Sequence, residues 1–251
     1  MTDFSFQLYS ARNFPPLTDT LKLLKAAGYT AVEGYGALYA DAASVKELTD
    51  NLAACGLTMP TGHFSLAMLE DEPARVLEIA KALGIETIYC PHIAPEQRPD
   101  SGAGWRDFGA RLQEVGQPYR DAGLGFSWHN HDFEFRPAAD GAIPQVALFE
   151  GGPDLEWEAD LAWVAKGGAD PAEYVRAFAG RLTAVHLKDI APEGEKDDED
   201  GWADLGDGVM DWTGLMTALR RTGVRYFVIE HDNPSDLRRF AERSIAAARK
   251  L

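Results

Sequence analysis

Short apolar runs alternate with amphipathic stretches along the whole chain. Runs of four to nine residues bounded by Gly, Pro or polar residues are typical of buried parallel strands, and apolar positions three to four apart predict helices. The predicted strands are 4–9, 30–33, 57–65, 87–91, 125–129, 155–158, 183–187 and 226–230. The predicted helices are 17–28, 44–56 (capped by Ser44), 73–84, 105–123, 143–149, 171–181, 212–223 and 235–250. Eight strand–helix units in 251 residues predict one α/β domain over residues 1–251, a (β/α)8 TIM barrel.

One long segment, 191–211, does not fit this alternation of strands and helices. It contains the acidic run 193–200, and like charges in series cannot be buried together, which predicts a solvated surface insertion. Its position after the seventh strand, with Gly206 and Gly208 as hinges, also fits a lid over the barrel rim.

Composition narrows the functional classes. The chain has 24 Lys and Arg against 40 Asp and Glu, a net charge of -16, which disfavours nucleic acid as a partner. No run of about 18 apolar residues predicts a membrane span, and residues 1–4 lack the features of a secretory leader. Cys55 and Cys90 show no CxxC spacing and are expected to be buried free thiols. We therefore expect a soluble cytoplasmic protein that acts on a small molecule, either as a monomer or as a homo-oligomer.

Polar residues follow several predicted strands at the point where each strand ends. Asp160, His186 and Glu230 are examples, and the strand-five segment 129–134 holds further acids and histidines. Taken singly, each is equally typical of a solvated carboxylate or a hydrogen-bonded core residue. Because the carboxyl ends of barrel strands meet at one rim, these side chains are expected to converge. A mostly oxygen donor set suits Mn²⁺, Mg²⁺ or Co²⁺, so the combination favours a metal site.

Several strings resemble the sugar isomerase/epimerase group of the xylose isomerase-like barrel superfamily. They are Trp128-His129-Asn130-His131-Asp132-Phe133-Glu134-Phe135, Asp160-Leu161-Ala162-Trp163, Val185-His186-Leu187-Lys188-Asp189 and Val228-Ile229-Glu230. Relatives include ketose 3-epimerases, hydroxypyruvate isomerases, inosose dehydratases and lyases acting on 3-keto-glycosides. The resemblance implies a small-molecule sugar substrate and one divalent ion, with Mn²⁺ favoured and Mg²⁺, Co²⁺ or Zn²⁺ as alternatives. The implied ligands are Glu134, Asp160, His186 and Glu230.

The chain departs from that group at two positions. Three residues after the strand-six aspartate, the epimerases and the endonuclease IV relatives have a histidine where this chain has Trp163. This weakens a tri-zinc DNA-repair interpretation. The fifth strand ends at His129 where epimerases place a metal-binding glutamate, and the nearest acids are Asp132 and Glu134.

Further rim residues are candidates for substrate contacts. Glu33 and His63 occupy positions that face the substrate in the group that this chain resembles, His92 lies at the end of the fourth strand, and Trp163 is expected to form an apolar wall. Lys188, two residues after His186, is a candidate to neutralise an oxyanion or to bind a hydroxyl. A structural hydrogen bond remains the alternative for each polar residue.

The implied reaction passes through an enediolate. A sugar carbonyl and its neighbouring hydroxyl chelate the ion, which stabilises the negative charge left when the adjacent carbon loses a proton. Glu134 and Glu230 are candidates for acid/base catalysis, with His129 and His131 as alternatives. Return of the proton to carbon makes the enzyme an isomerase or epimerase, whereas loss of a β-oxygen substituent makes it a lyase or dehydratase. A non-catalytic sugar-binding barrel is a further alternative.

Overall fold

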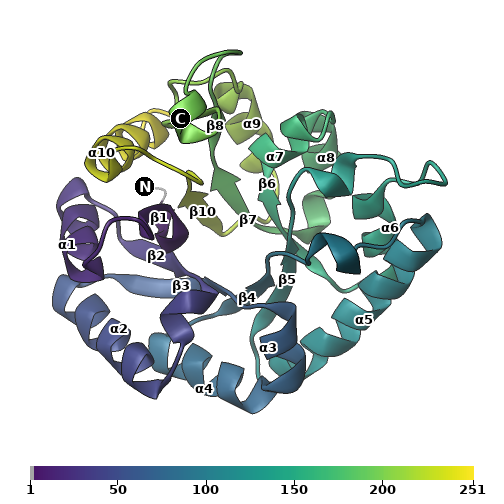
Figure 1. Ribbon diagram of the computed structural model, residues 1–251, viewed down its shortest axis with the longest axis horizontal. Helices are drawn as coiled ribbons and strands as arrows, with labels where there is room; N and C mark the ends of the chain where they lie inside the picture. The colour runs from purple at the N-terminus through teal and green to yellow at the C-terminus, as the bar shows by residue number, and fades with distance from the viewer. Residues whose placement is uncertain (1–2) are drawn as a thin grey trace.

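A closed barrel of parallel strands forms the centre of the molecule. The computed structural model describes residues 3–251, and its barrel has the strand order β1-β10-β7-β6-β5-β4-β3-β2. Figure 1 shows these strands as a central ring surrounded by helices, with β1 beside β10 where the ring closes. The eight barrel strands are β1 (Phe4–Gln7), β2 (Ala31–Gly34), β3 (Thr58–His63), β4 (Thr87–Cys90), β5 (Gly125–His129), β6 (Glu156–Asp160), β7 (Leu182–Leu187) and β10 (Tyr226–Ile229). The predicted fold is confirmed.

Helices connect successive strands on the outside of the ring. The α-helices are α1 (Leu17–Ala27), α2 (Ala42–Cys55), α3 (Leu66–Asp71), α4 (Pro73–Leu83), α5 (Gly102–Asp121), α6 (Pro144–Gly151), α7 (Leu161–Lys166), α8 (Pro171–Ala177), α9 (Trp212–Leu219) and α10 (Leu237–Ala248). Within residues 3–251, no helix combines the length and the apolar character that a bilayer crossing requires.

Three of the differences between the observed elements and the sequence prediction have a clear local cause. Helix α2 begins at Ala42 because the side chain of Asp41, not Ser44, caps it by accepting from the backbone N–H of Ser44. The short helices α3 and α7 were not predicted. Each begins where a polar side chain, Ser65 or Asp160, caps a turn directly after a strand, and six residues are too few to show a helical period.

Alternation along each strand separates an apolar outer layer from a polar lumen. On β1, the ring of Phe6 packs on Phe240 of α10, whereas the amide of Gln7 donates to Glu33 inside the barrel. Successive strand side chains point to opposite faces, so the apolar core lies between strands and helices. The polar residues at the strand ends are thereby directed towards one mouth of the barrel.

Helices α5 and α6 cross at a pair of glycines. A Cβ added at Gly109 would lie 2.0 Å from the carbonyl oxygen of Leu148, and one at Gly151 would lie 1.9 Å from that of Arg106. Backbone atoms of one helix therefore occupy the space that side chains would need on the other. Figure 1 shows these two helices side by side at the edge of the barrel.

We expect Gly109→Ala to destabilise the protein by about 1–3 kcal/mol, because overpacking outweighs the better helix propensity of alanine. Urea unfolding followed by circular dichroism measures this change. Gly180→Ala is the matched control: a Cβ at that position meets no atom of residues 3–251 within 4 Å other than those of its chain neighbours. Equal stabilities of the two variants would contradict the explanation.

The insertion 191–211 is folded against the barrel. Its strand β9 (Trp202–Ala203) pairs with β8 (Asp189–Ile190), and Trp202 is buried against Trp163 at 4.7 Å between ring centroids. Glu199 is also buried, although the acidic residues before it are exposed. Its carboxylate accepts from the backbone N–H of Ser235 at 2.7 Å and from Arg239 Nη2 at 2.6 Å. These bonds attach the insertion to the start of α10.

This anchor should depend on pH. Although burial alone raises the pKa of Glu199, hydrogen bonds from Ser235 and Arg239 lower the pKa from 4.5 to about 2. A carboxyl with a depressed folded-state pKa contributes stability above its unfolded pKa and loses that contribution as the pH falls through the folded value. We expect Glu199→Gln to cost about 1–3 kcal/mol at pH 7, and less as the pH drops from 4.5 towards 2. Urea unfolding at several pH values tests this, with the exposed Glu195→Gln as control.

Candidate functional site

Three side chains meet at the carboxyl ends of neighbouring strands. Asp160 is the last residue of β6, His186 lies in β7, and Glu230 follows β10. The Nδ1 atom of His186 lies 3.0 Å from Glu230 Oε2 and 3.8 Å from Asp160 Oδ2, and all three residues are buried. One ligand atom from each lies within 4.8 Å of the others. The barrel thus brings together three of the four residues that were predicted to bind a metal.

The structure does not place Glu134 with these three residues. Its Oε1 accepts from the indole N–H of Trp128 at 3.1 Å, and its Oε2 accepts from the backbone N–H of His131 at 3.0 Å. Glu134 lies in the loop beyond the end of β5, and this loop turns the carboxyl back towards its own backbone. Burial raises the pKa of Glu134 to about 8, so a proton rather than an ion can neutralise it. Its position indicates a structural contribution to the loop.

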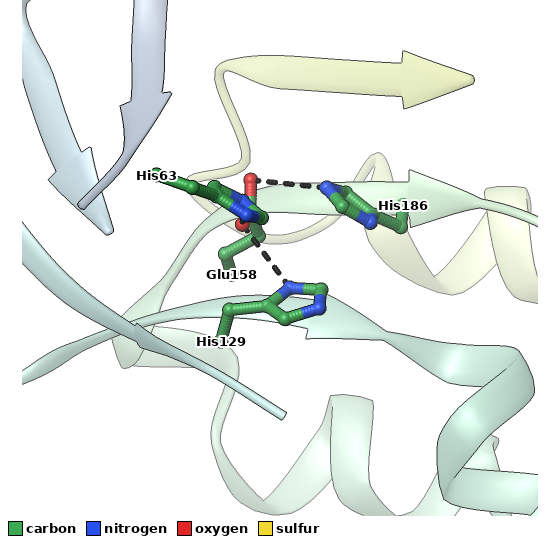
Figure 2. Close-up of side chains that lie close together, drawn as sticks. All are labelled: His63, His129, Glu158 and His186. Carbon is green, nitrogen blue, oxygen red and sulfur yellow. Dashed lines mark hydrogen bonds and ion pairs between the residues drawn. The ribbon is translucent and has the colours of Figure 1, made fainter. Parts of the chain in front are cut away.

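A second polar cluster lies deeper in the lumen. Glu158, two residues before Asp160 on β6, places its Oε2 atom 2.6 Å from His63 Nε2 and 3.1 Å from His129 Nδ1. Its Oε1 atom lies 3.4 Å from His186 Nε2. Figure 2 shows the imidazoles of His63, His129 and His186 around this carboxylate. Four different barrel strands contribute these side chains.

Glu33 completes the deeper cluster from β2. Its Oε1 atom lies 2.8 Å from His186 Nε2 and 3.2 Å from His63 Nε2, and accepts from Gln7 Nε2 at 2.8 Å. Glu33 was predicted to face the substrate, but it is fully buried against His186. A carboxylate on the far nitrogen of an imidazole fixes the orientation of the ring and leaves Nδ1 directed at Asp160 and Glu230.

Lys188 lies among carboxylates at the same mouth. Its Nζ is 3.0 Å from Glu230 Oε2 and 3.4 Å from Asp160 Oδ2, and it also contacts Asp232. Burial alone lowers the pKa of Lys188, but Asp232, Glu230 and Asp160 raise it above its ordinary value. The ammonium group also lies 4.3 Å from the ring centroid of Trp202. Lys188 is therefore a buried, fully charged counter-ion to the acids.

A cavity of about 520 Å³ opens above these groups. Its lining residues come from the ends of several strands and are Gln7, Tyr9, Tyr35, Gly36, His63, Ser65, Pro91, His92, His129, His131, Glu230 and Asp232. The predicted contacts His63 and His92 line it, as do His129 and His131. Trp163 lies behind this wall, with its ring centroid 5.5 Å from that of His131.

Burial and charge set the protonation of the site. Burial, together with the neighbouring Lys188 ammonium, lowers the pKa of His131 to about 3, and burial also lowers the pKa of His129 well below 6.5. Both rings are thus neutral at pH 7. Burial raises the pKa of Asp160 to about 6, and Lys188 opposes this shift. Lys188 and His186 overcome the effect of burial on Glu230 and lower its pKa.

The donor atoms fit a divalent ion. Asp160 uses Oδ1 to accept from the backbone N–H of Trp163, but its buried Oδ2 has no hydrogen-bond partner among residues 3–251. Two carboxylates and one imidazole form a mixed oxygen and nitrogen donor set, which suits Mn²⁺, Co²⁺ or Zn²⁺. Asp160, His186 and Glu230 could therefore hold a metal.

Sequence reasoning did not identify Glu158, Gln7 or Asp232 as parts of this network. A signal for Glu158 was present, because Glu156, Glu158 and Asp160 alternate with apolar residues and so share one face of β6. Gln7 and Asp232 carried no comparable signal. Their position depends on closure of the barrel between β1 and β10.

Solved structures share this fold at low sequence identity. A sugar phosphate isomerase/epimerase from Parabacteroides distasonis has a TM-score of 0.80 at 20% identity, covering 98% of this chain and 94% of that one. A probable 3-DHS dehydratase from Bacillus anthracis has a TM-score of 0.74 at 14% identity, covering 99% of both chains. The 3-keto-D-glucoside 4-epimerase of E. coli has a TM-score of 0.72 at 17% identity, covering 100% of both. Identities this low establish the fold alone.

Sequence comparison places the chain in a family. A search of curated proteins finds no match. The family model described as xylose isomerase-like TIM barrel matches residues 21–251, nearly the whole chain. Together with the closed eight-stranded barrel, this match shows that the protein belongs to the xylose isomerase-like TIM barrel family.

Proposed function

We propose that the protein is a divalent-metal-dependent sugar isomerase or epimerase that acts through an enediolate on a ketose or related keto-sugar. The observation that carries the proposal is the convergence of Asp160, His186 and Glu230 beside a cavity of about 520 Å³. The structural neighbours named as a sugar phosphate isomerase/epimerase and a 3-keto-D-glucoside 4-epimerase support the same class. Of the four predicted ligands, the proposal keeps these three and omits Glu134.

The residues of this chain prepare the site for that chemistry. A bound divalent ion supplies a Lewis acid that stabilises negative charge on a sugar oxygen. Glu33 orients the His186 ring through Nε2, and Lys188 holds the carboxylates of Asp160 and Glu230 close together. The acids can therefore approach one another without the full cost of like-charge repulsion.

Proton transfer is assigned to groups that line the cavity. His131 is neutral and, with a pKa lowered to about 3, a weak base, so its buried Nδ1, which has no hydrogen-bond partner in the described part of the chain, is suited to accept a hydrogen bond rather than a proton. Glu230 and Asp232 line the cavity as well and follow β10, which β7 and β6 separate from β5. Glu230, whose lowered pKa keeps it ionised, is the candidate base, and His131 can hydrogen-bond a sugar hydroxyl from a different element of the cavity wall.

The aromatic lining suits a sugar ring. Tyr9 and Tyr35 pack edge to face at 5.4 Å between ring centroids at the cavity wall. Aromatic faces cover the apolar C–H surface of a pyranose or furanose and exclude water from the reacting carbon.

Proton exchange with solvent tests the reaction. Mn²⁺-loaded protein is incubated with a panel of ketoses and 3-keto-glycosides in D₂O, with chelator-treated protein as the control. Metal-dependent incorporation of deuterium at carbon, without loss of a substituent, is the expected result. Release of water or an aglycone would show a lyase or dehydratase instead, and ligand binding without any exchange would show a sugar-binding barrel.

A further inference from the structure

The deeper cluster is a donor set distinct from the three residues Asp160, His186 and Glu230. His63, His129 and Glu158 come from β3, β5 and β6, and one ligand atom from each lies within 4.8 Å of the others. The two sets meet at His186, whose Nδ1 faces Glu230 and whose Nε2 faces Glu33 and Glu158. Figure 2 shows the deeper set as a ring of imidazoles around one carboxylate.

Hydrogen bonds within residues 3–251 do not use all the polar atoms of this cluster. Glu158 Oε1 and His129 Nδ1 are buried without a hydrogen-bond partner there, as is Glu33 Oε2. A buried acceptor left without a partner costs about 1–3 kcal/mol. His129 Nδ1 lies 3.1 Å from Glu158 Oε2, and Glu158 Oε1 lies 3.4 Å from His186 Nε2, so these atoms surround one point without completing hydrogen bonds.

The two buried carboxylates of the cluster need positive charge beside them, which either a bound cation or a protonated imidazole supplies. Glu33 and Glu158 are completely buried, and the groups between them are imidazoles and one amide. The ammonium of Lys188 pairs with Asp160, Glu230 and Asp232 and so is directed at the other site. Two buried carboxylates are tolerated only if positive charge lies close to them.

We propose that His63, His129 and Glu158 hold a divalent cation of their own, of the Zn²⁺ or Co²⁺ class, separate from the ion at Asp160 and Glu230. Two imidazoles and one carboxylate are a donor set that Zn²⁺ adopts at sites with an open position. His63 and His129 both line the cavity, so an ion enters from it and keeps that position towards it.

Counting bound ions tests this site independently of any reaction. The full-length protein, stripped with chelator, is dialysed against Zn²⁺ or Co²⁺ and its metal content is measured by mass spectrometry. We expect two equivalents per chain in the wild type and one in each of His63→Asn and His129→Asn. Asp160→Asn should also bind one equivalent, because it removes the other ion. Circular dichroism confirms that each variant is folded, and His92→Asn, at the exposed rim, is the matched control that should retain two.

The outcomes distinguish this inference from the proposed function. The proposed function rests on the ion at Asp160, and the two-ion count rests on both. One equivalent in the wild type, lost in Asp160→Asn and kept in His129→Asn, would overturn the second site and leave the proposed function intact. In that case a proton on His63 balances Glu33 and Glu158. One equivalent that depends on His129 and not on Asp160 would support the deeper site and contradict the proposed function.

Discussion

Replacing Glu230 by Gln is expected to abolish turnover and to weaken binding of the metal. The amide keeps the shape of the side chain but removes one of the two carboxylates beside His186 Nδ1. Loss of a residue that merely supports a ligand costs about 10–100-fold in affinity or activity, so loss of a ligand should exceed about 100-fold. Calorimetric titration with Mn²⁺ measures the affinity, and deuterium exchange into the sugar measures the activity.

A variant with the same chemical change elsewhere controls for that experiment. Glu242→Gln removes an exposed carboxylate of α10 that pairs with Arg238, and it should leave both measurements unchanged. A Glu230→Gln protein with wild-type activity would show that the reaction does not use this carboxylate.

Replacing Lys188 by Met is expected to destabilise the protein more than either Gly109→Ala or Glu199→Gln. The variant leaves Asp160, Glu230 and Asp232 without the buried ammonium group that neutralises them. Removing one partner from a buried ion pair costs about 3–5 kcal/mol. Urea unfolding in the presence of chelator should show a loss of this size.

Adding Mn²⁺ should restore part of that stability. An ion that binds only the folded state stabilises it, and it would supply positive charge beside the same carboxylates. Lys46→Met, which removes an exposed partner of Asp50 on α2, should change the stability by less than about 0.5 kcal/mol with or without the ion. A Lys188→Met protein as stable as this control would contradict the counter-ion interpretation.

The strands and helices of the barrel could be predicted from local sequence patterns. The apolar runs at 87–91 and 125–129 lie within a residue of β4 and β5, and glycines in the left-handed conformation end α1 and α4 at Gly28 and Gly84. Strand and helix signals of this kind depend on neighbouring residues only. Short capped helices such as α7 were not predicted, because the only local signal of α7 is one capping side chain, Asp160, which the sequence analysis interpreted as a metal ligand.

The sequence alone predicted that Asp160, His186 and Glu230 converge, because parallel strands of a closed barrel direct their carboxyl ends to one mouth. It also determined the family through strings such as Val185-His186-Leu187-Lys188-Asp189. Only the tertiary structure decided that Glu134 turns away and that Glu158 lies among three imidazoles. The physical reason is that a strand fixes the direction of its side chains by alternation, whereas a loop residue such as Glu134 is placed by hydrogen bonds to Trp128 and His131. Contacts between distant strands, such as Glu33 with His186, exist only after the barrel has closed.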